Sequence, residues 1–197
     1  MKNNKLFLIT SFIEGGTLLA TELISAKAVA PYYGTSIVVW ALVLSITLLG
    51  LAIGYYLGGK YTVNEFSNKP LLIVFGAAIV LNLISPFLSK AIMQMLINFD
   101  LGIAVFISLL IFLAPLMIVY GMISPMIVGK LQLFNTTQNN VGLVFSVSTF
   151  GGVLFCFLYG LYVIPFWGLN EAYFLNAVLL LFCLPIFVFG KTTTIKN

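Results

Sequence analysis

Two acidic residues, Glu14 and Glu22, lie inside a stretch of the chain, residues 10–30, that is otherwise apolar enough to enter a membrane. A carboxylate that faces lipid costs about 2.5–3.5 kcal/mol or more. Two carboxylates on one helix therefore require water, a cation or neighbouring hydrogen-bond donors. Groups of this kind are suited to binding a cation or a proton, so we expect the segment to face the interior of a helical bundle.

Helical spacing places further polar residues beside Glu14. At about 100° per residue, Thr17, Thr21 and Ser25 fall within about 60° of Glu14, and Glu22 falls about 80° away. The opposite side carries apolar residues, namely Phe12, Leu19, Ala20 and Leu23. The spacing thus predicts a first helix with one polar face along its whole length.

The composition indicates a protein that crosses a membrane several times. Hydrophobic residues make up 61% of the 197 residues and charged residues only 7%, whereas soluble domains contain about 25% charged residues. The longest polar stretch, residues 59–69, has the length of a connector. We expect an all-α polytopic membrane protein in which residues 1–197 form a single transmembrane domain.

Motifs that would support an enzyme are missing from the sequence. All nine basic residues are Lys and there is no His, which removes the usual metal ligand and proton shuttle. There is no P-loop, HExxH or nucleophile–base pair. Glu14 and Glu22 lie about 12 Å apart along a helix, too far for acid–base work on one bond but suitable for two points on an ion path. We expect no catalysis, cofactor, metal or nucleic acid.

Six segments are apolar and long enough to span a bilayer, which takes about 20 residues. They are residues 6–30, 36–57, 70–88, 101–128, 141–164 and 171–189. We expect a turn at 31–34, a short interfacial connector at 90–100 and a turn at 165–170. The fourth span should be interrupted by Pro115, Gly121 and Pro125, with a helix break at Ser124-Pro125.

The distribution of Lys indicates the orientation. Lys27 and Lys90 fall on one side of the predicted membrane, and the seven others fall on the opposite side, namely Lys2, Lys5, Lys60, Lys69, Lys130, Lys191 and Lys196. An excess of Lys marks the cytoplasmic side. The pattern predicts a multi-pass protein of a bacterial inner membrane with both termini in the cytoplasm.

Small residues recur at a spacing of four in two of the predicted spans. Gly50, Gly54 and Gly58 form such a series in the second span, and the fifth span contains the pairs Gly142/Ser146 and Ser148/Gly152. This spacing lets two helix backbones approach closely within a bilayer. We expect helix–helix contacts at these positions.

Polar residues in other spans extend the list of candidates. They are Asn82 in the third span, Tyr120 and Ser124 in the fourth, and Asn176 in the sixth. Each is compatible with a helix–helix hydrogen bond or with ligand binding. The predicted substrate- or ion-binding set is Glu14, Glu22, Thr17, Thr21, Asn82 and Tyr120.

Several short motifs also follow one another in a characteristic order. They are Glu14-Gly15, Glu22-Leu23, Lys27, Ala30-Pro31, Tyr33-Gly34, Ser36, Val39-Trp40 and the glycine-rich run 50–59, then Gly121-Met122-x-Ser124-Pro125, the run 146–152, and Ile164-Pro165-x-x-Gly168. This order resembles the N-terminal membrane region of bacterial spermidine-synthase-like proteins. In those proteins a major-facilitator-like part is fused to an aminopropyltransferase-like domain.

The resemblance implies six helices similar to half of a major-facilitator bundle. Two features depart from it: Lys27 stands where the family commonly has Arg, and residues 1–197 contain no aminopropyltransferase-like domain. Aminopropyl transfer is therefore not implied.

Two functions follow as expectations. The chain is a transporter-like half-bundle that moves a small solute, such as a polyamine-like cation, as a dimer with Glu14 as the cation or proton site. Alternatively, it is a non-transporting membrane anchor or scaffold for a separately encoded spermidine-synthase-like enzyme or another partner. The loops at 59–69 and 129–140 would then be the docking surface.

Overall fold

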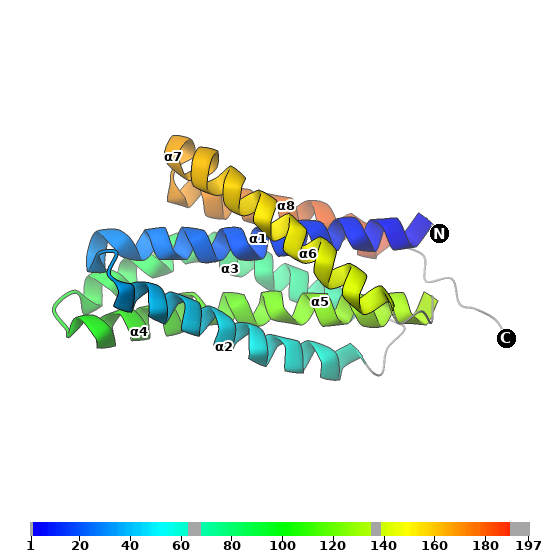
Figure 1. Cartoon of the computed structure of the whole chain (residues 1–197), viewed down its shortest axis with the longest axis horizontal. Helices are drawn as coiled ribbons and strands as arrows, with labels where there is room; N and C mark the ends of the chain where they lie inside the picture. The colour runs from blue at the N-terminus through cyan, green and yellow to red at the C-terminus, as the bar shows by residue number, and fades with distance from the viewer. Residues whose placement is uncertain (1, 63–67, 135–138, 190–197) are drawn as a thin grey trace.

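The structure is a computed structural model that describes residues 2–62, 68–134 and 139–189, and within these ranges it contains helices and no strand (Figure 1). Most of the helices run along the long axis of the molecule, and α6 crosses them obliquely. In chain order they are α1 (Lys2–Tyr33), α2 (Ile37–Thr62), α3 (Lys69–Leu96), α4 (Leu101–Phe112), α5 (Ala114–Phe134), α6 (Asn139–Leu158), the π-helix η1 (Tyr159–Val163), α7 (Ile164–Trp167) and α8 (Leu169–Phe189).

Five helical segments are long and apolar enough to cross a membrane. They are Lys5–Tyr33, Ile37–Tyr61, Lys69–Leu96, Ala114–Gln132 and Asn140–Trp167. The apolar segments Leu101–Phe112 and Leu169–Pro185 are shorter. The all-helical prediction is confirmed for the described residues, and the expected sixth span is not among these five long segments.

The first helix ends later than the sequence predicted. Pro31 lies inside α1, and the chain turns at Gly34, which has a φ of 77°. A proline near the end of a helix removes one hydrogen-bond donor, here the donor to the Lys27 carbonyl, and the helix continues for only two more residues. The expected turn at 31–34 is therefore wrong by about one helical turn.

The third helix also continues past its predicted end. It runs through Pro86 to Leu96, so residues 90–96 belong to α3 and not to a separate connector. The hydroxyl of Ser85 donates to the Leu81 carbonyl (2.7 Å) and that of Ser89 to the Pro86 carbonyl (3.3 Å). After the turn, the Asp100 carboxylate caps α4 by accepting from two backbone amides, those of Gly102 and Ile103.

The predicted fourth span is interrupted at Leu113, near Pro115 as expected, and not at Gly121 or Ser124-Pro125. Leu113 separates α4 from α5, and Pro115 lies two residues later, in the first turn of α5. Pro115 has no N–H to donate to the preceding turn, which explains the interruption. By contrast, α5 passes through Pro125 without a break.

The predicted turn at 165–170 is shorter in the structure. Pro165 lies within α7, and the chain turns at Gly168, which has a φ of 97°.

Two pairs of helices cross with their backbones in near contact. A Cβ added at Gly15 of α1 would collide with the Ser148 carbonyl of α6, and one at Gly151 with the Phe12 carbonyl. In the other pair, a Cβ at Gly54 of α2 would collide with the Ile118 carbonyl of α5. The predicted contacts of Gly50, Gly54, Gly58, Ser148 and Gly152 are confirmed, but Gly142 has no neighbour within 4 Å and Ser146 is exposed.

The helices pair as α1 with α6, α2 with α5 and α3 with α8. Residue order shows that α1 and α8 are antiparallel, because Thr21 contacts Asn176 whereas Ser25 contacts Tyr173. The start of α1 and the end of α8 therefore lie at the same end of the bundle (Figure 1).

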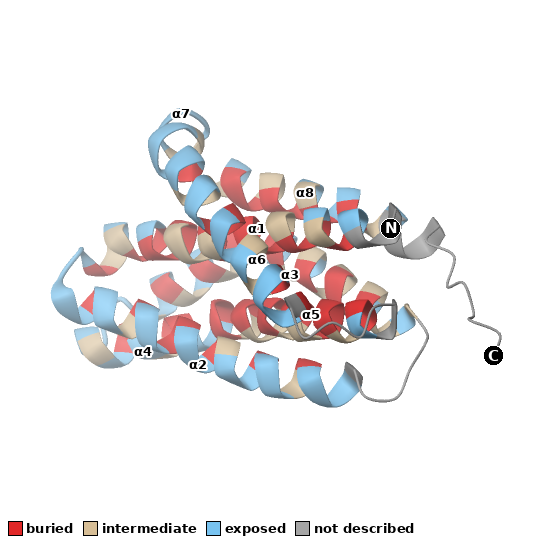
Figure 2. Cartoon of the chain, turned by 45° about the vertical axis from the view of Figure 1, so that its right-hand side comes forward, coloured by how far each residue is buried: buried red, intermediate tan, exposed pale blue. Residues whose placement is uncertain are grey.

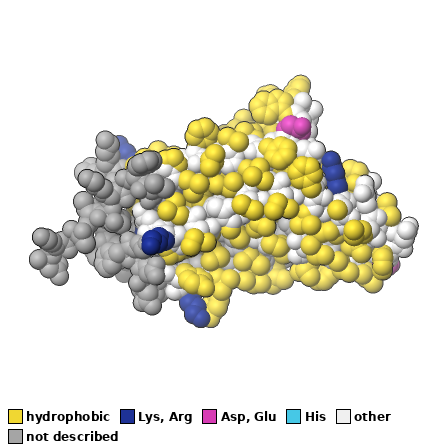
Figure 3. Space-filling model, turned by 180° about the vertical axis from the view of Figure 1, so that it is seen from behind, with side chains coloured by type: hydrophobic (Ala, Val, Ile, Leu, Met, Phe, Trp, Pro, Cys, Tyr) yellow, Lys and Arg dark blue, Asp and Glu magenta, His cyan; other side chains and the backbone are white. Residues whose placement is uncertain are grey.

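Apolar side chains cover much of the outer surface. Buried residues face the interior of the bundle, and the outer sides of α2 and α6 are largely exposed (Figure 2). Large exposed apolar side chains include Leu48 of α2, Phe150 of α6 and Phe182 of α8. Figure 3 shows hydrophobic side chains over most of one face, with the charged ones away from its middle. This distribution is typical of a surface in contact with lipid.

We predict that Gly54→Ala destabilises the protein by about 1–3 kcal/mol, because the added methyl group forces α2 and α5 apart. Gly76→Ala in α3 is the matched control: a Cβ there meets nothing within 4 Å, and alanine favours the helix by up to about 1 kcal/mol. Unfolding in mixed detergent micelles measures both changes. Equal stability of the two variants would contradict the close crossing.

Candidate functional site

The carboxylate of Glu14 lies in the interior, at the point where three helices meet. The side chain is 1% exposed. The hydroxyl of Ser124 in α5 donates a hydrogen bond to its Oε2 atom (3.0 Å), and the hydroxyl of Ser148 in α6 donates to the same atom (3.2 Å). The prediction that Glu14 faces inward is confirmed.

The glycines of α1 and α6 bring these groups together. Gly15 directly follows Glu14 and lies against the backbone of Ser148, so a short serine side chain is enough to reach the carboxylate. A residue with a Cβ at Gly15 would separate the helices. The sequence indicated Ser148 only as a small residue, and its hydrogen bond to Glu14 was not predicted.

Glu22 does not join Glu14. Its side chain is only half-buried and lies beside Thr47 of α2. The Thr47 side chain is 2% exposed, so Glu22 meets a buried hydroxyl of α2. The two acidic residues therefore have different neighbours. They point in directions about 80° apart around the axis of α1, so Glu14 meets α5 and α6 whereas Glu22 meets α2.

A second polar group of side chains lies further along α1. The amide of Asn82 in α3 donates to the hydroxyl of Tyr120 in α5 (3.0 Å) and to the Ala78 carbonyl (2.8 Å). The amide of Asn176 in α8 donates to the Thr21 hydroxyl (2.9 Å), which in turn donates to the Thr17 carbonyl (2.7 Å). Thr21 also lies within 3.5 Å of Asn82 and 3.4 Å of Tyr120.

The π-helix η1 adds a tyrosine to this group. The hydroxyl of Tyr159 donates to Oδ1 of Asn176 (2.6 Å). Closer to the end of α1, the hydroxyls of Ser25 and Tyr173 are 2.9 Å apart. Tyr159 and Tyr173 were not predicted, since a tyrosine in an apolar segment is equally typical of a membrane interface.

We call Thr21, Asn82, Tyr120, Asn176 and Tyr159 the interior polar network. Its members come from α1, α3, α5, α8 and η1, and each is buried. They are neutral groups that satisfy one another, as buried polar groups generally do. Thr17 borders the network: its hydroxyl donates to the carbonyls of Ile13 and Glu14, and its own carbonyl accepts from Thr21 and Asn176. The network therefore connects the helices by hydrogen bonds between neutral side chains. Among the predicted site residues, Glu14 is the buried one that can carry a charge.

No family model, curated protein or solved structure matches the chain. Among the described residues there is also no group of three or more His, Cys, Asp or Glu side chains placed to hold a metal ion. The resemblance to spermidine-synthase-like membrane regions stays a prediction from sequence motifs.

We predict that Thr21 and Asn176 are energetically coupled. In a double-mutant cycle of Thr21→Val and Asn176→Leu, the coupling energy should be about 0.6–1.7 kcal/mol, between the average and the maximum found for hydrogen bonds between membrane helices. The readout is the free energy of unfolding in detergent.

A matched cycle replaces Thr21→Val with Thr149→Val, since Thr149 is exposed on α6. Its coupling to Asn176→Leu should be close to zero. Equal coupling in the two cycles would show that the hydrogen bond does not carry the effect.

Proposed function

We propose that the chain is a six-span membrane bundle that transports a small solute and uses Glu14 as its cation or proton site. The observation that supports this is the buried Glu14 carboxylate with its two hydroxyl donors on separate helices. Ionisable residues inside a membrane are costly and mark ion or substrate pathways.

The six spans are α1, α2, α3, α4 with α5, α6 with its continuation to Trp167, and α8. Only one residue separates α4 from α5. The 21 residues of α8 extend about 31 Å at 1.5 Å per residue, close to the thickness of a bilayer core. Together with the Lys distribution, this even number favours two cytoplasmic termini in a bacterial inner membrane.

The pairing of helices supports the likeness to half of a major-facilitator transporter. The first three spans, α1, α2 and α3, correspond in order to the last three, α5 (with α4), α6 and α8. When each span is exchanged with its counterpart, the close pair α1/α6 becomes the close pair α5/α2, and the pair α3/α8 stays the same. Inverted repeats of three helices are found in each half of these transporters. The glycines follow the same exchange, because Gly15 in α1 and Gly121 in α5 each lie at a crossing.

A solute path would run along the side of α1 between α2 and α6. The rings of Tyr55 in α2 and Phe145 in α6 meet there edge to face, with centroids 5.9 Å apart. Tyr55 is also close enough to Glu14 to interact with it electrostatically. Separation of this ring pair would open Glu14 to a second copy of the bundle, so we favour a homodimer as the working unit.

Substitution of Glu14 tests this proposal. Gln keeps the size of the side chain and can accept from both serines, but it has no charge. Uptake of radiolabelled spermidine into proteoliposomes should fall by about tenfold or more in Glu14→Gln, since a hydrogen bond to a charged group contributes about 1.5–3 kcal/mol.

Glu171→Gln is the matched control, because Glu171 is exposed in the first turn of α8. It should transport at the rate of the unmodified protein. Normal uptake by Glu14→Gln, or an equal loss in both variants, would contradict a specific role for Glu14.

One observation favours the anchor or scaffold function instead. The interior polar network is internally hydrogen-bonded, as expected for a static core. A soluble partner that co-purifies in a fixed ratio, with no uptake activity, would favour this second function. Its proposed docking loops include residues 63–67 and 135–138, which lie outside the described residues.

A further inference from the structure

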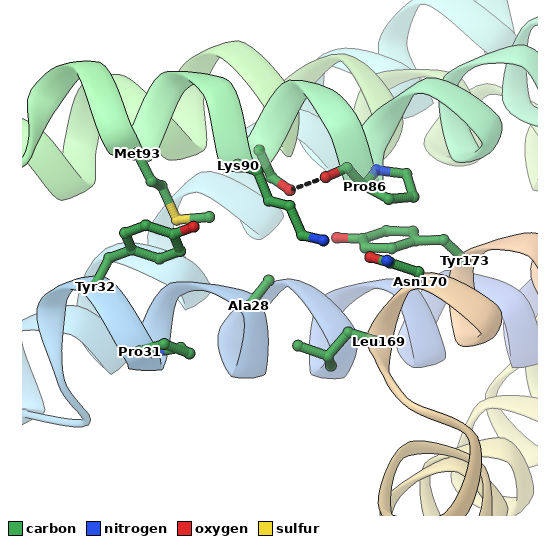
Figure 4. Close-up of a pocket in the computed structure, with 10 residues that line it drawn as sticks. Ala28, Pro31, Tyr32, Pro86, Lys90, Met93, Leu169, Asn170 and Tyr173 are labelled. Atoms are coloured by element: carbon green, nitrogen blue, oxygen red, sulfur yellow. Dashed lines mark hydrogen bonds between the residues drawn. The ribbon is translucent and has the colours of Figure 1, made fainter.

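A cavity of ≈ 200 Å³ lies at the end of the bundle where α1 ends and α8 begins. Its walls come from the last turns of α1, the second half of α3 and the first turns of α8 (Figure 4). Ala28, which lines it, is 14 residues after Glu14, a distance of about 21 Å along the helix. The cavity is thus separate from the Glu14 site.

Two of the polar side chains that line the cavity, Lys90 and Asn170, can donate hydrogen bonds into it. The amine of Lys90 points towards Tyr173 and Asn170 (Figure 4). Within the described ranges, the Lys90 amine has neither an ion pair nor a hydrogen bond. An ammonium group can only donate, and the amide of Asn170 adds two more donors.

The start of α8 adds to this positive character. Leu169 and Asn170 line the cavity and belong to the first turn of α8. Backbone amides in a first turn have no carbonyl partner within the helix, and the helix dipole makes this end positive. The carboxylate of Glu171 lies in the same turn near Gly168, outside the cavity lining, and offsets part of this positive charge. The Lys90 ammonium is therefore the main group that favours an anion.

Most of the remaining wall is apolar. Ala28, Pro31, Pro86 and Met93 contribute it, and a small hydrated anion would gain little from these side chains. An anionic group joined to an apolar part fits the cavity better. Next to it, the ring of Phe87 in α3 lies 6.5 Å from that of Phe174 in α8, and Phe87 is 68% exposed. An apolar chain that leaves the cavity would meet these rings between α3 and α8.

We propose that this cavity binds the phosphate group of an anionic phospholipid, with the Lys90 ammonium and the first turn of α8 as its donors. The headgroup occupies the cavity and an acyl chain follows the Phe87–Phe174 surface. This inference depends on the membrane location of the bundle and not on transport, so either function above is compatible with it.

Native mass spectrometry of the purified full chain in neutral detergent tests the site. Phosphatidylglycerol and phosphatidylcholine are added at equal concentrations, and the bound lipids are counted. The unmodified protein should retain one phosphatidylglycerol in preference to phosphatidylcholine. In Lys90→Gln this retention should fall by about tenfold, the equivalent of one charge-assisted hydrogen bond.

Lys27→Gln is the control, because Lys27 is exposed next to Ala28 at the same end of α1 but does not line the cavity. It should bind phosphatidylglycerol like the unmodified protein. Ala28→Leu should weaken binding because it fills the cavity while the Lys90 charge stays in place. Lys90→Arg keeps the charge and should bind phosphatidylglycerol like the unmodified protein. These two variants separate loss of the site from misfolding.

Normal binding by Lys90→Gln, or an equal loss in Lys27→Gln, would overturn the proposal. Glycerol phosphate provides the second arm of the experiment. If it binds in a Lys90-dependent manner and phosphatidylglycerol binds no better, the phosphate ligand is a soluble one and the assignment to lipid is wrong.

Discussion

The hydrogen bonds between Glu14 and the serines of α5 and α6 are the interaction on which the arrangement of this bundle depends. A carboxylate in an apolar interior needs donors, and here both come from other helices. Three helices must therefore meet at one level, with α1 in the middle. The close crossing at Gly15 follows from the same need, because Ser148 reaches the carboxylate only if α1 and α6 approach at backbone distance.

The remaining helices are held by different means. Glycine contacts join α2 to α5, whereas α3 and α8 are joined to α1 through the amides of Asn82 and Asn176. Helices in a membrane gain little from burial of apolar surface against one another, since lipid is equally apolar. Close packing and hydrogen bonds then decide the arrangement. The charged site and the neutral network have separate roles in the proposed function: Glu14 binds, and the network keeps its surroundings in place.

The polar face of α1 could be predicted from the sequence because helical periodicity is a local property and a lipid-facing carboxylate is costly. The neighbours of Glu22 could not be predicted in this way, because they depend on where α2 lies. The ends of the first and third helices were predicted too early, at residues 30 and 88. Pro31 did not end the first helix, because a proline removes one hydrogen bond without always ending a helix. The contributions of Ser148 and Tyr159 depend on contacts between distant parts of the chain, and no local pattern indicated them.

The central claim is that the Glu14 carboxylate faces its serine neighbours and not lipid. Solid-state NMR of the unmodified protein in lipid bilayers tests it most directly, and the presence of only five acidic residues keeps the carboxyl region of the spectrum simple. We expect through-space cross-peaks from the Glu14 carboxyl carbon to the Cβ atoms of Ser124 and Ser148, with no direct transfer from acyl-chain protons. Strong transfer from acyl chains to the Glu14 carboxyl carbon, without the serine cross-peaks, would contradict it.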